Sequence, residues 1–167
     1  EYLKGFEKME LVSTGSLLGV RETRRIVGDY ELNLDDFTSR AVFPDEIGRY
    51  SYPVDIHIAR PDKESYDNFR KEMATYRLGK GESYGIPYRI LTPKGLKNVL
   101  VAGRCVSTDR PLQASIRVMP GCYITGQAAG MAATLMVEGN TDSRGIAVNE
   151  LQRRLVEMGG YLPNYGG

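Results

Sequence analysis

Two stretches of this 167-residue sequence decide the fold that we expect: VLVAGR, residues 99–104, and RVMPGCYITGQAAGMAA, residues 117–133. The first opens with four apolar residues, a run typical of a strand buried on both faces of a sheet in a layered α/β domain. The second predicts a helix of small residues with Pro120 in its first turn. A long connection, residues 103–119, joins them, and loops of that length in compact domains are usually functional. Strand, loop and helix together predict a ligand-binding crevice.

Small residues dominate one face of this predicted helix. At helical spacing, that face carries Cys122, Gly126, Ala129 and Ala133. Glycine inside a helix costs about 1 kcal/mol relative to alanine, so Gly126 and Gly130 require a packing or ligand reason. The open backbone N–H groups of residues 119–122 would attract oxygen-rich or anionic groups. Spacing alone fits a helix tightly packed on a sheet as well as it fits a ligand site.

Composition narrows the function classes. Lys and Arg total 22 against 21 for Asp and Glu, a net charge of +1, which disfavours nucleic acid and acidic membrane surfaces as partners. No apolar stretch is long enough for a membrane span. Two cysteines and one histidine exclude zinc sites of paired CxxC motifs and multi-histidine metal centres, so we expect no metal. The compartment stays open between cytoplasm and, for an exported precursor, periplasm.

Other segments give weaker predictions of structure. Strands are expected at residues 9–14, 24–28, 50–58 and 84–91, with a short helix starting at residues 34–37 and a turn at residues 93–95. A final helix should begin near Val148 and stop at Gly159 and Gly160. The polar residues 60–85 predict a mobile surface insertion.

Five blocks of the sequence resemble, in the family's order, the C-terminal part of FAD-dependent oxidoreductases with a glutathione-reductase-like fold. They are residues 21–28, 52–57, 86–89, 100–104 with 117–120, and 126–130. The resemblance implies an α/β fold of mixed α+β character. Residues 1–92 would form part of the substrate-binding domain, residues 93–140 the last strand and helix of the FAD domain, and residues 141–167 a C-terminal helix and tail.

The resemblance also implies a cofactor, FAD, and places residues around it. Gly103 and Arg104 would lie beside the flavin ribityl chain. The oxygen-rich edge of the isoalloxazine would face backbone groups of Val118, Met119, Pro120 and Gly121, and Arg117 would also bind the cofactor. Backbone donors and a helix dipole at that edge would stabilise the negative charge of reduced flavin.

Catalytic and substrate-binding candidates lie in the other blocks. His57 is the only side chain suited to accept a proton near neutral pH, and Tyr88 could donate to a substrate oxygen. Arg24 and Arg89 could bind a carboxylate in two-point fashion. Each has a structural alternative: a hydrogen-bonded histidine, a packed tyrosine, or an ion-paired arginine. Cys105 and Cys122 flank the expected crevice without the spacing of a redox motif.

One departure from the family pattern is large, because no G-x-G-x-x-G follows an early strand. That fingerprint holds the cofactor pyrophosphate in such folds. We therefore expect the chain to be a fragment, inactive alone, that needs the N-terminal part of the same protein. The parent would transfer a hydride from a small or saccharide-like substrate to flavin. Two alternatives remain: a non-catalytic binding domain on this scaffold, and a lyase or isomerase that uses flavin without net redox turnover.

Overall fold

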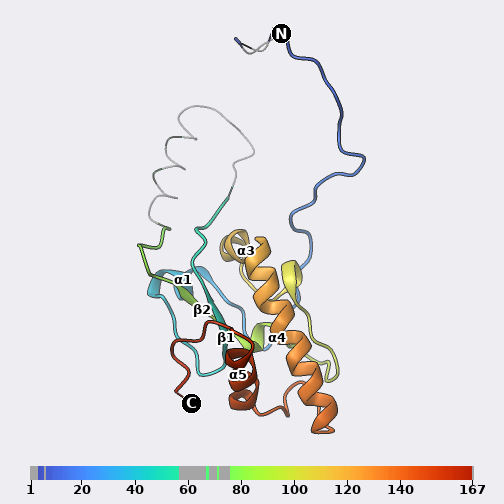
Figure 1. The fold of residues 1–167 in the computed structure, drawn as a ribbon, viewed down its shortest axis with the longest axis vertical. Helices are drawn as coiled ribbons and strands as arrows, with labels where there is room; N and C mark the ends of the chain where they lie inside the picture. Colours follow the sequence, from blue (N-terminus) through green and yellow to red (C-terminus); the bar gives the residue numbers. More distant parts are fainter. Residues whose placement is uncertain (1–3, 6, 57–66, 68–70, 72–75, 167) are drawn as a thin grey trace.

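The computed structural model describes residues 4, 5, 7–56, 67, 71 and 76–166 (Figure 1). In chain order its elements are α1 (Leu34–Ser39), β1 (Glu46–Tyr50), β2 (Tyr84–Pro87), η1 (Tyr88–Ile90), η2 (Gly103–Cys105), α3 (Arg110–Ile116), α4 (Met119–Glu138) and α5 (Val148–Glu157). Helices and a small antiparallel sheet therefore share the described chain, which is consistent with an α/β class. Residues 7–20 are exposed throughout and run away from the other elements.

The sheet pairs β1 with β2 in antiparallel register, with Tyr50 opposite Tyr84 and Gly48 opposite Ile86. Helix α4 packs on β1, and the contact depends on a glycine. A Cβ on Gly48 would lie 2.6 Å from Cγ2 of Ile124, closer than real Cβ contacts allow. The missing side chain at position 48 is what lets the helix approach the strand.

Helices α3 and α4 meet in a tight corner. Asp109 begins α3 by accepting a hydrogen bond from the Leu112 N–H at 2.7 Å, and its other oxygen accepts from the Leu34 N–H of α1 at 2.9 Å. At the far end of α3, a Cβ on Gly121 would lie 2.3 Å from the carbonyl oxygen of Ile116. The start of α4 is therefore fixed against the end of α3.

A single apolar cluster connects these elements. Its fully buried members include Phe37 of α1, Tyr84 and Ile86 of β2, Leu112 and Ile116 of α3, Ala128 and Ala132 of α4, and Leu151 of α5. Each of the three segments expected from the sequence, residues 1–92, 93–140 and 141–167, supplies side chains to it. The division into those segments stays a prediction.

Several predictions of secondary structure are confirmed. Helix α1 begins with a capping box in which Asn33 and Asp36 each accept from the other's backbone, and Pro120 lies in the first turn of α4. Helix α5 ends before Gly159, whose φ of +87° lies in the left-handed region that favours glycine. The turn at residues 93–95 also forms.

The predicted strands are mostly wrong. Residues 99–102 form no strand in the described chain: Val99 is 40 % exposed, and the segment makes one backbone bond, from the Val101 N–H to the Leu91 oxygen at 2.9 Å. Residues 103–119 are not a loop, because η2 and α3 occupy them. Residues 9–14 form no strand, and residues 24–28 form only a bridge between Gly28 and Pro93.

The two remaining predicted strands are correct only in part. β1 ends at Tyr50, where the expected strand at 50–58 would begin, and residues 51–56 are irregular. The end of that expected strand, residues 57 and 58, lies outside the described residues, as does most of the first half of the expected insertion. The expected strand at 84–91 turns into η1 after Pro87.

The buried face of α4 is not the small-residue face of Cys122, Gly126, Ala129 and Ala133. The buried residues of α4 are Gly121, Thr125, Ala128, Ala132 and Leu135. Gly126 and Gly130 are exposed, and a Cβ on either would meet no atom within 4 Å. No packing partner within the described chain explains these two glycines.

Candidate functional site

The start of α4 lies against the η2 turn, which carries two of the predicted cofactor residues. The Gly103 N–H donates to Thr125 Oγ1 at 2.9 Å, and its φ of +73° requires a residue that tolerates the left-handed region. The neighbouring Arg104 is exposed and donates from Nε to the carbonyl oxygen of Arg117 at 3.3 Å. The structure thus brings Gly103 and Arg104 to the N-terminal end of α4, and their role at the cofactor stays a prediction.

The backbone donors at this helix end are not equivalent. The Val118 N–H donates to the Ser115 carbonyl oxygen at 3.4 Å, and Pro120 has no N–H. Gly121 is buried, with its N–H towards the hydroxyl of Tyr50 but outside hydrogen-bond geometry. Met119, 61 % exposed, keeps an N–H with no acceptor among the described residues. Met119 therefore offers the accessible backbone donor.

Tyr50 is a residue that the sequence reasoning missed. It is 8 % exposed, and its hydroxyl makes no hydrogen bond with any described residue. Burial raises the pKa of Tyr50 to about 12, and the backbone N–H of Gly121 opposes that rise. The hydroxyl is therefore neutral and desolvated at physiological pH, directly behind the first turn of α4.

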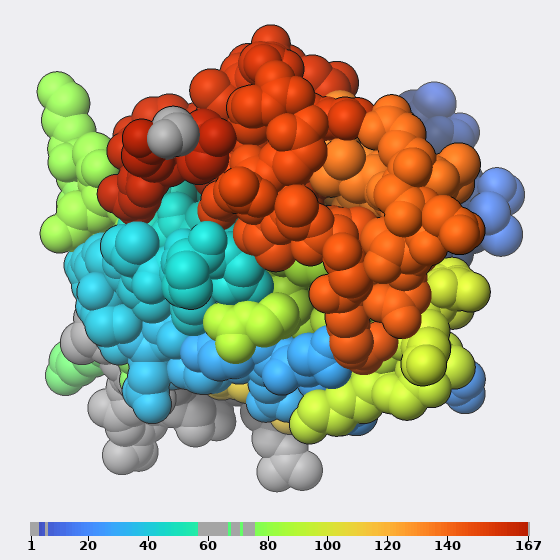
Figure 2. Space-filling view, turned by 90° about the horizontal axis from the view of Figure 1, so that it is seen from below, coloured from blue at the N-terminus to red at the C-terminus, as the bar shows by residue number. Residues whose placement is uncertain are grey.

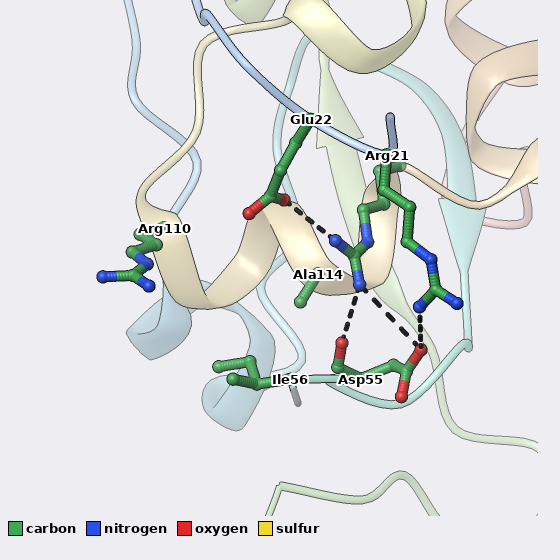
Figure 3. Close-up of a pocket in the computed structure, with 7 residues that line it drawn as sticks. Arg21, Glu22, Asp55, Ile56, Arg110 and Ala114 are labelled. Atoms are coloured by element: carbon green, nitrogen blue, oxygen red, sulfur yellow. Dashed lines mark hydrogen bonds and ion pairs between the residues drawn. The ribbon is translucent and has the colours of Figure 1, made fainter. Parts of the chain in front are cut away.

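Arg117 is the fixed centre of the surrounding surface. It follows α3 directly, and its side chain is 11 % exposed. Its Nη1 lies 3.2 Å from Glu22 Oε2, and its Nη2 donates to the Asp55 carbonyl oxygen at 2.9 Å and lies 3.9 Å from Asp55 Oδ2. Arg21 reaches the same Asp55 oxygen from the other side at 3.9 Å (Figure 3). Two carboxylates thus hold one buried guanidinium in place.

Two cavities adjoin this ion-paired centre. The helix-end cavity, about 270 Å³, is lined by Arg21, Tyr52, Asp55, Arg104, Arg117, Val118 and Met119. The arginine cavity, about 370 Å³, is lined by Arg21, Glu22, Asp55, Ile56, Arg110, Ala114 and Arg117 (Figure 3). They share Arg21, Asp55 and Arg117. The Arg117–Asp55 contact therefore forms part of a wall common to both cavities.

Tyr88 and Arg89 lie elsewhere. The Tyr88 side chain is buried, its hydroxyl donates to the Ser143 carbonyl oxygen at 2.8 Å, and burial raises its pKa. Arg89 binds Asp45 through Nε at 2.9 Å and Nη2 at 3.2 Å, with its guanidinium 5.0 Å from the ring centre of Tyr30. Both line a third cavity that shares no residue with the first two. The structure does not bring them to Arg104 and Arg117.

Ion pairs and hydrogen bonds around the third cavity hold separate segments of the chain together. Arg144 pairs with Asp29 at 2.9 Å and donates to the Pro93 carbonyl oxygen at 2.7 Å, while the Thr92 hydroxyl donates to Asp29 at 2.7 Å. These bonds fasten the connection between α4 and α5 to the segments before α1 and after η1 (Figure 2). The side chains of Arg144, Asp29 and Thr92 therefore have their hydrogen-bond or ion-pair partners within the chain.

The remaining candidates are placed as follows. Arg24 is exposed and lines none of these cavities. His57 lies outside the described residues, although Ile56, which precedes it, lines the arginine cavity. Cys105 and Cys122 are free thiols, and Cys122 donates to the Arg117 carbonyl oxygen at 3.3 Å.

Two lining residues of the arginine cavity, Glu22 and Arg110, were missed as well. Glu22 lies in the block of residues 21–28 that resembles the family. Arg110 follows Asp109 and precedes Pro111, which is the pattern of a helix start and could have placed it at the beginning of α3. No local sequence signal marks Tyr50.

The model of the family of FAD dependent oxidoreductases matches residues 1–155. The chain belongs to this family. Its cofactor is FAD, as predicted, and membership in an oxidoreductase family assigns it to flavin redox chemistry at the level of class. No curated protein and no solved structure matches the chain. The glutathione-reductase-like subdivision stays a prediction.

The residues around the helix-end cavity fit part of FAD. The cofactor presents carbonyl oxygens and phosphates, which accept hydrogen bonds, and the cavity offers the Met119 N–H, the positive end of α4 and the Arg104 guanidinium. Pockets that enclose whole ligands are typically about 300–1,000 Å³. At about 270 Å³ this cavity accommodates a portion of the cofactor. The sequence contains no fingerprint for the pyrophosphate.

Two other classes of site are not found in the described part of the chain. Within the described ranges, no helix has the length and apolar character needed to cross a membrane. In the same part of the chain, no three His, Cys, Asp or Glu side chains gather in a way that could hold a metal ion.

Proposed function

We propose that the protein is an FAD-dependent oxidoreductase whose flavin accepts a hydride from a small organic substrate, with the first turn of α4 at the oxygen-rich edge of the isoalloxazine. The observation that carries this is the convergence of η2 and the start of α4 on the helix-end cavity. Family membership supports the cofactor, and the donors of Met119 and Arg104 support its position. The cofactor supplies the redox chemistry, and the chain supplies charge and orientation.

Helix α4 is suited to stabilise negative charge. It runs for 20 residues from Met119 to Glu138, and Val118 caps it without a side-chain hydrogen bond. Neither an acidic residue in the first turn nor a capping oxygen neutralises the positive end of the dipole. Negative charge on the flavin edge would therefore be stabilised by the positive end of the α4 dipole, which no acidic side chain or capping oxygen neutralises.

Arg117 acts here as a positioning residue. Its carbonyl oxygen accepts from Arg104 Nε and from the Cys122 thiol, while Glu22 and Asp55 hold its guanidinium. These bonds fix the corner from which α4 starts. A change at Arg117 would therefore displace donors without removing them.

His57 is the proposed base, because it is the only histidine and directly follows Asp55 and Ile56, which line the arginine cavity. Tyr88 and Arg89 stay proposals as substrate contacts, but their bonds to Ser143 and Asp45 support a structural role better. The pyrophosphate site, absent from this sequence, we assign to an N-terminal part of the same protein.

The decisive experiment removes one backbone donor. Proline is tolerated at the first helical position, and Val118 already has the extended ψ of 149° that a residue before proline adopts. In the intact protein, Met119→Pro deletes the N–H, whereas Met119→Ala keeps it and changes only the side chain. A hydrogen bond to a charged group contributes roughly 1.5–3 kcal/mol. At about 30 mV per 1.4 kcal/mol for two electrons, Met119→Pro should lower the flavin midpoint potential by roughly 30–60 mV.

The readout is the midpoint potential from a dye-coupled reductive titration followed at the flavin absorbance band. Met119→Ala should stay near the parent value. Equal midpoint potentials for the two variants would show that the start of α4 does not lie at the flavin edge. An intact protein that retains no flavin would overturn the whole assignment.

A further inference from the structure

We propose that the arginine cavity binds the substrate through anionic oxygen groups, carboxylates or phosphates, with Arg110 and Arg21 as ligands on opposite sides of the cavity. This deepens the proposed function and rests on it, because the substrate must then lie beside the flavin edge. It identifies the substrate as a small organic anion.

The first step is the position of the cavity. It shares Arg21, Asp55 and Arg117 with the helix-end cavity, so a molecule in one lies next to a molecule in the other. The Arg117 part of this shared wall is held in place, because its side chain is only 11 % exposed and is bound on two sides. A substrate held in the arginine cavity would therefore be oriented towards the start of α4.

The second step is charge. The linings of the two cavities together contain four arginines and two carboxylates. Arg117 neutralises much of Glu22 and Asp55, whose carboxylates face it. What remains is an excess of positive charge on exposed guanidinium groups, which attracts anions and repels cations.

The third step is which guanidinium groups are available. Arg110 is exposed and makes no ion pair or side-chain hydrogen bond among the described residues. It lies on the other side of Ala114 from Arg21 and Asp55 (Figure 3). The ion pair of Arg21 with Asp55 is long, 3.9 Å, and the Arg21 side chain is 59 % exposed. Exposed pairs of this kind are weak, so Arg21 can turn to a ligand at little cost.

The fourth step is the apolar part of the lining. Ile56 and Ala114 lie between the charged groups, and Ala114 is 4 % exposed. A carbon skeleton can rest on these two side chains while the guanidinium group on either side binds a charged end. The lining therefore favours an organic anion over a bare inorganic ion.

The test measures anion binding by the intact, flavin-containing protein. Sodium succinate and sodium phosphate are titrated at constant ionic strength with chloride, and both the melting temperature and the flavin absorbance band are recorded. We compare Arg110→Gln with Arg77→Gln, a matched control that removes the same charge from an exposed arginine lining neither cavity. Neither side chain is buried, so both variants should fold.

We expect succinate to raise the melting temperature and to perturb the flavin band. Arg110→Gln should weaken the apparent succinate affinity about tenfold, and Arg77→Gln should leave it within about twofold. If phosphate shows this Arg110 dependence and succinate does not, the anionic group is a phosphate. No binding of either anion, or equal effects of the two variants, would overturn the inference.

The two proposals fail in different ways. A protein without flavin contradicts the proposed function, while the melting temperature still reports anion binding. A protein that contains flavin but ignores both anions contradicts only the inference.

Discussion

Two glycines of the same helix should respond to alanine in opposite directions. A Cβ on Gly121 would lie 2.3 Å from the carbonyl oxygen and 3.1 Å from the carbonyl carbon of Ile116, whereas a Cβ on Gly126 would meet nothing within 4 Å. The clashing atoms at Gly121 are backbone atoms at the end of α3. They cannot rotate away as the tip of a side chain could.

The two expected magnitudes follow from these contacts. Alanine gains up to about 1 kcal/mol over glycine in a helix interior, so Gly126→Ala should raise the free energy of unfolding by about 0.5–1 kcal/mol. Overpacking costs typically about 1–3 kcal/mol, and backbone displacement puts Gly121→Ala at the upper end. After the helical gain, Gly121→Ala should lower the free energy of unfolding by about 2 kcal/mol. For a chain of this length these values correspond to melting-temperature changes of roughly +1 to +4 °C and −4 to −8 °C.

The assay is urea denaturation followed by circular dichroism at 222 nm, with the slope m checked for constancy. Flavin content of the intact protein gives a second readout, because Gly121→Ala displaces the start of α4 and Gly126→Ala does not. A destabilising Gly126→Ala would refute the reasoning, since it would mean that the small-residue face is packed after all. A neutral Gly121→Ala would show that the corner between α3 and α4 is loose.

Two further predictions concern buried polar groups in the sheet. Tyr50→Phe removes a buried hydroxyl that makes no hydrogen bond and should raise the free energy of unfolding by about 1 kcal/mol. Tyr84→Phe removes a hydroxyl that lies 2.8 Å from Ser115 Oγ and should lower the free energy of unfolding by about 1 kcal/mol. Urea denaturation of both variants measures these changes. Burial raises the pKa of the Glu46 carboxyl above 4.5, although Arg49 lies 2.7 Å away. As pH rises, the carboxyl of Glu46 therefore deprotonates at a lower pH in the unfolded chain than in the folded protein. The free energy of unfolding should consequently fall as pH rises from 4.5 towards the pKa of the folded state. Subtracting the pH profile of Glu46→Gln from that of the parent should leave this falling slope, and a rising difference would contradict it.

Local signals were enough to predict three of the helices, α1, α4 and α5, but α3 was missed because residues 103–119 were expected to be a loop. Pro120 at a first turn, glycines after residue 158 and acidic residues at a helix start each act within a few positions, and α4, α5 and α1 form where these signals stand. Strand pairing is non-local by contrast. Residues 99–102 have the composition of a central strand, but the described chain supplies no neighbouring strand to pair with them.

Helical spacing also could not decide which side of α4 is buried. The residues at 122, 126, 129 and 133 share a face, and so do those at 121, 125, 128 and 132. Both faces consist of small residues. The choice depends on where Ile116 and Gly48 lie, and the contact of Gly48 with Ile124 brings together segments distant in the chain.

The arginines of the site also show that local sequence does not reveal which distant residue a side chain will contact. An arginine embedded in a matched block indicates the family but not the partner of its guanidinium. Arg89 is held by Asp45, 44 positions away, and Arg117 by Glu22, 95 positions away, so both are bound inside the fold. Arg110 lies in none of the blocks that resemble the family, yet among the described residues no carboxylate pairs with it. Whether an arginine is available to a substrate therefore depends on whether folding brings a carboxylate to it, and that is a property of the tertiary structure.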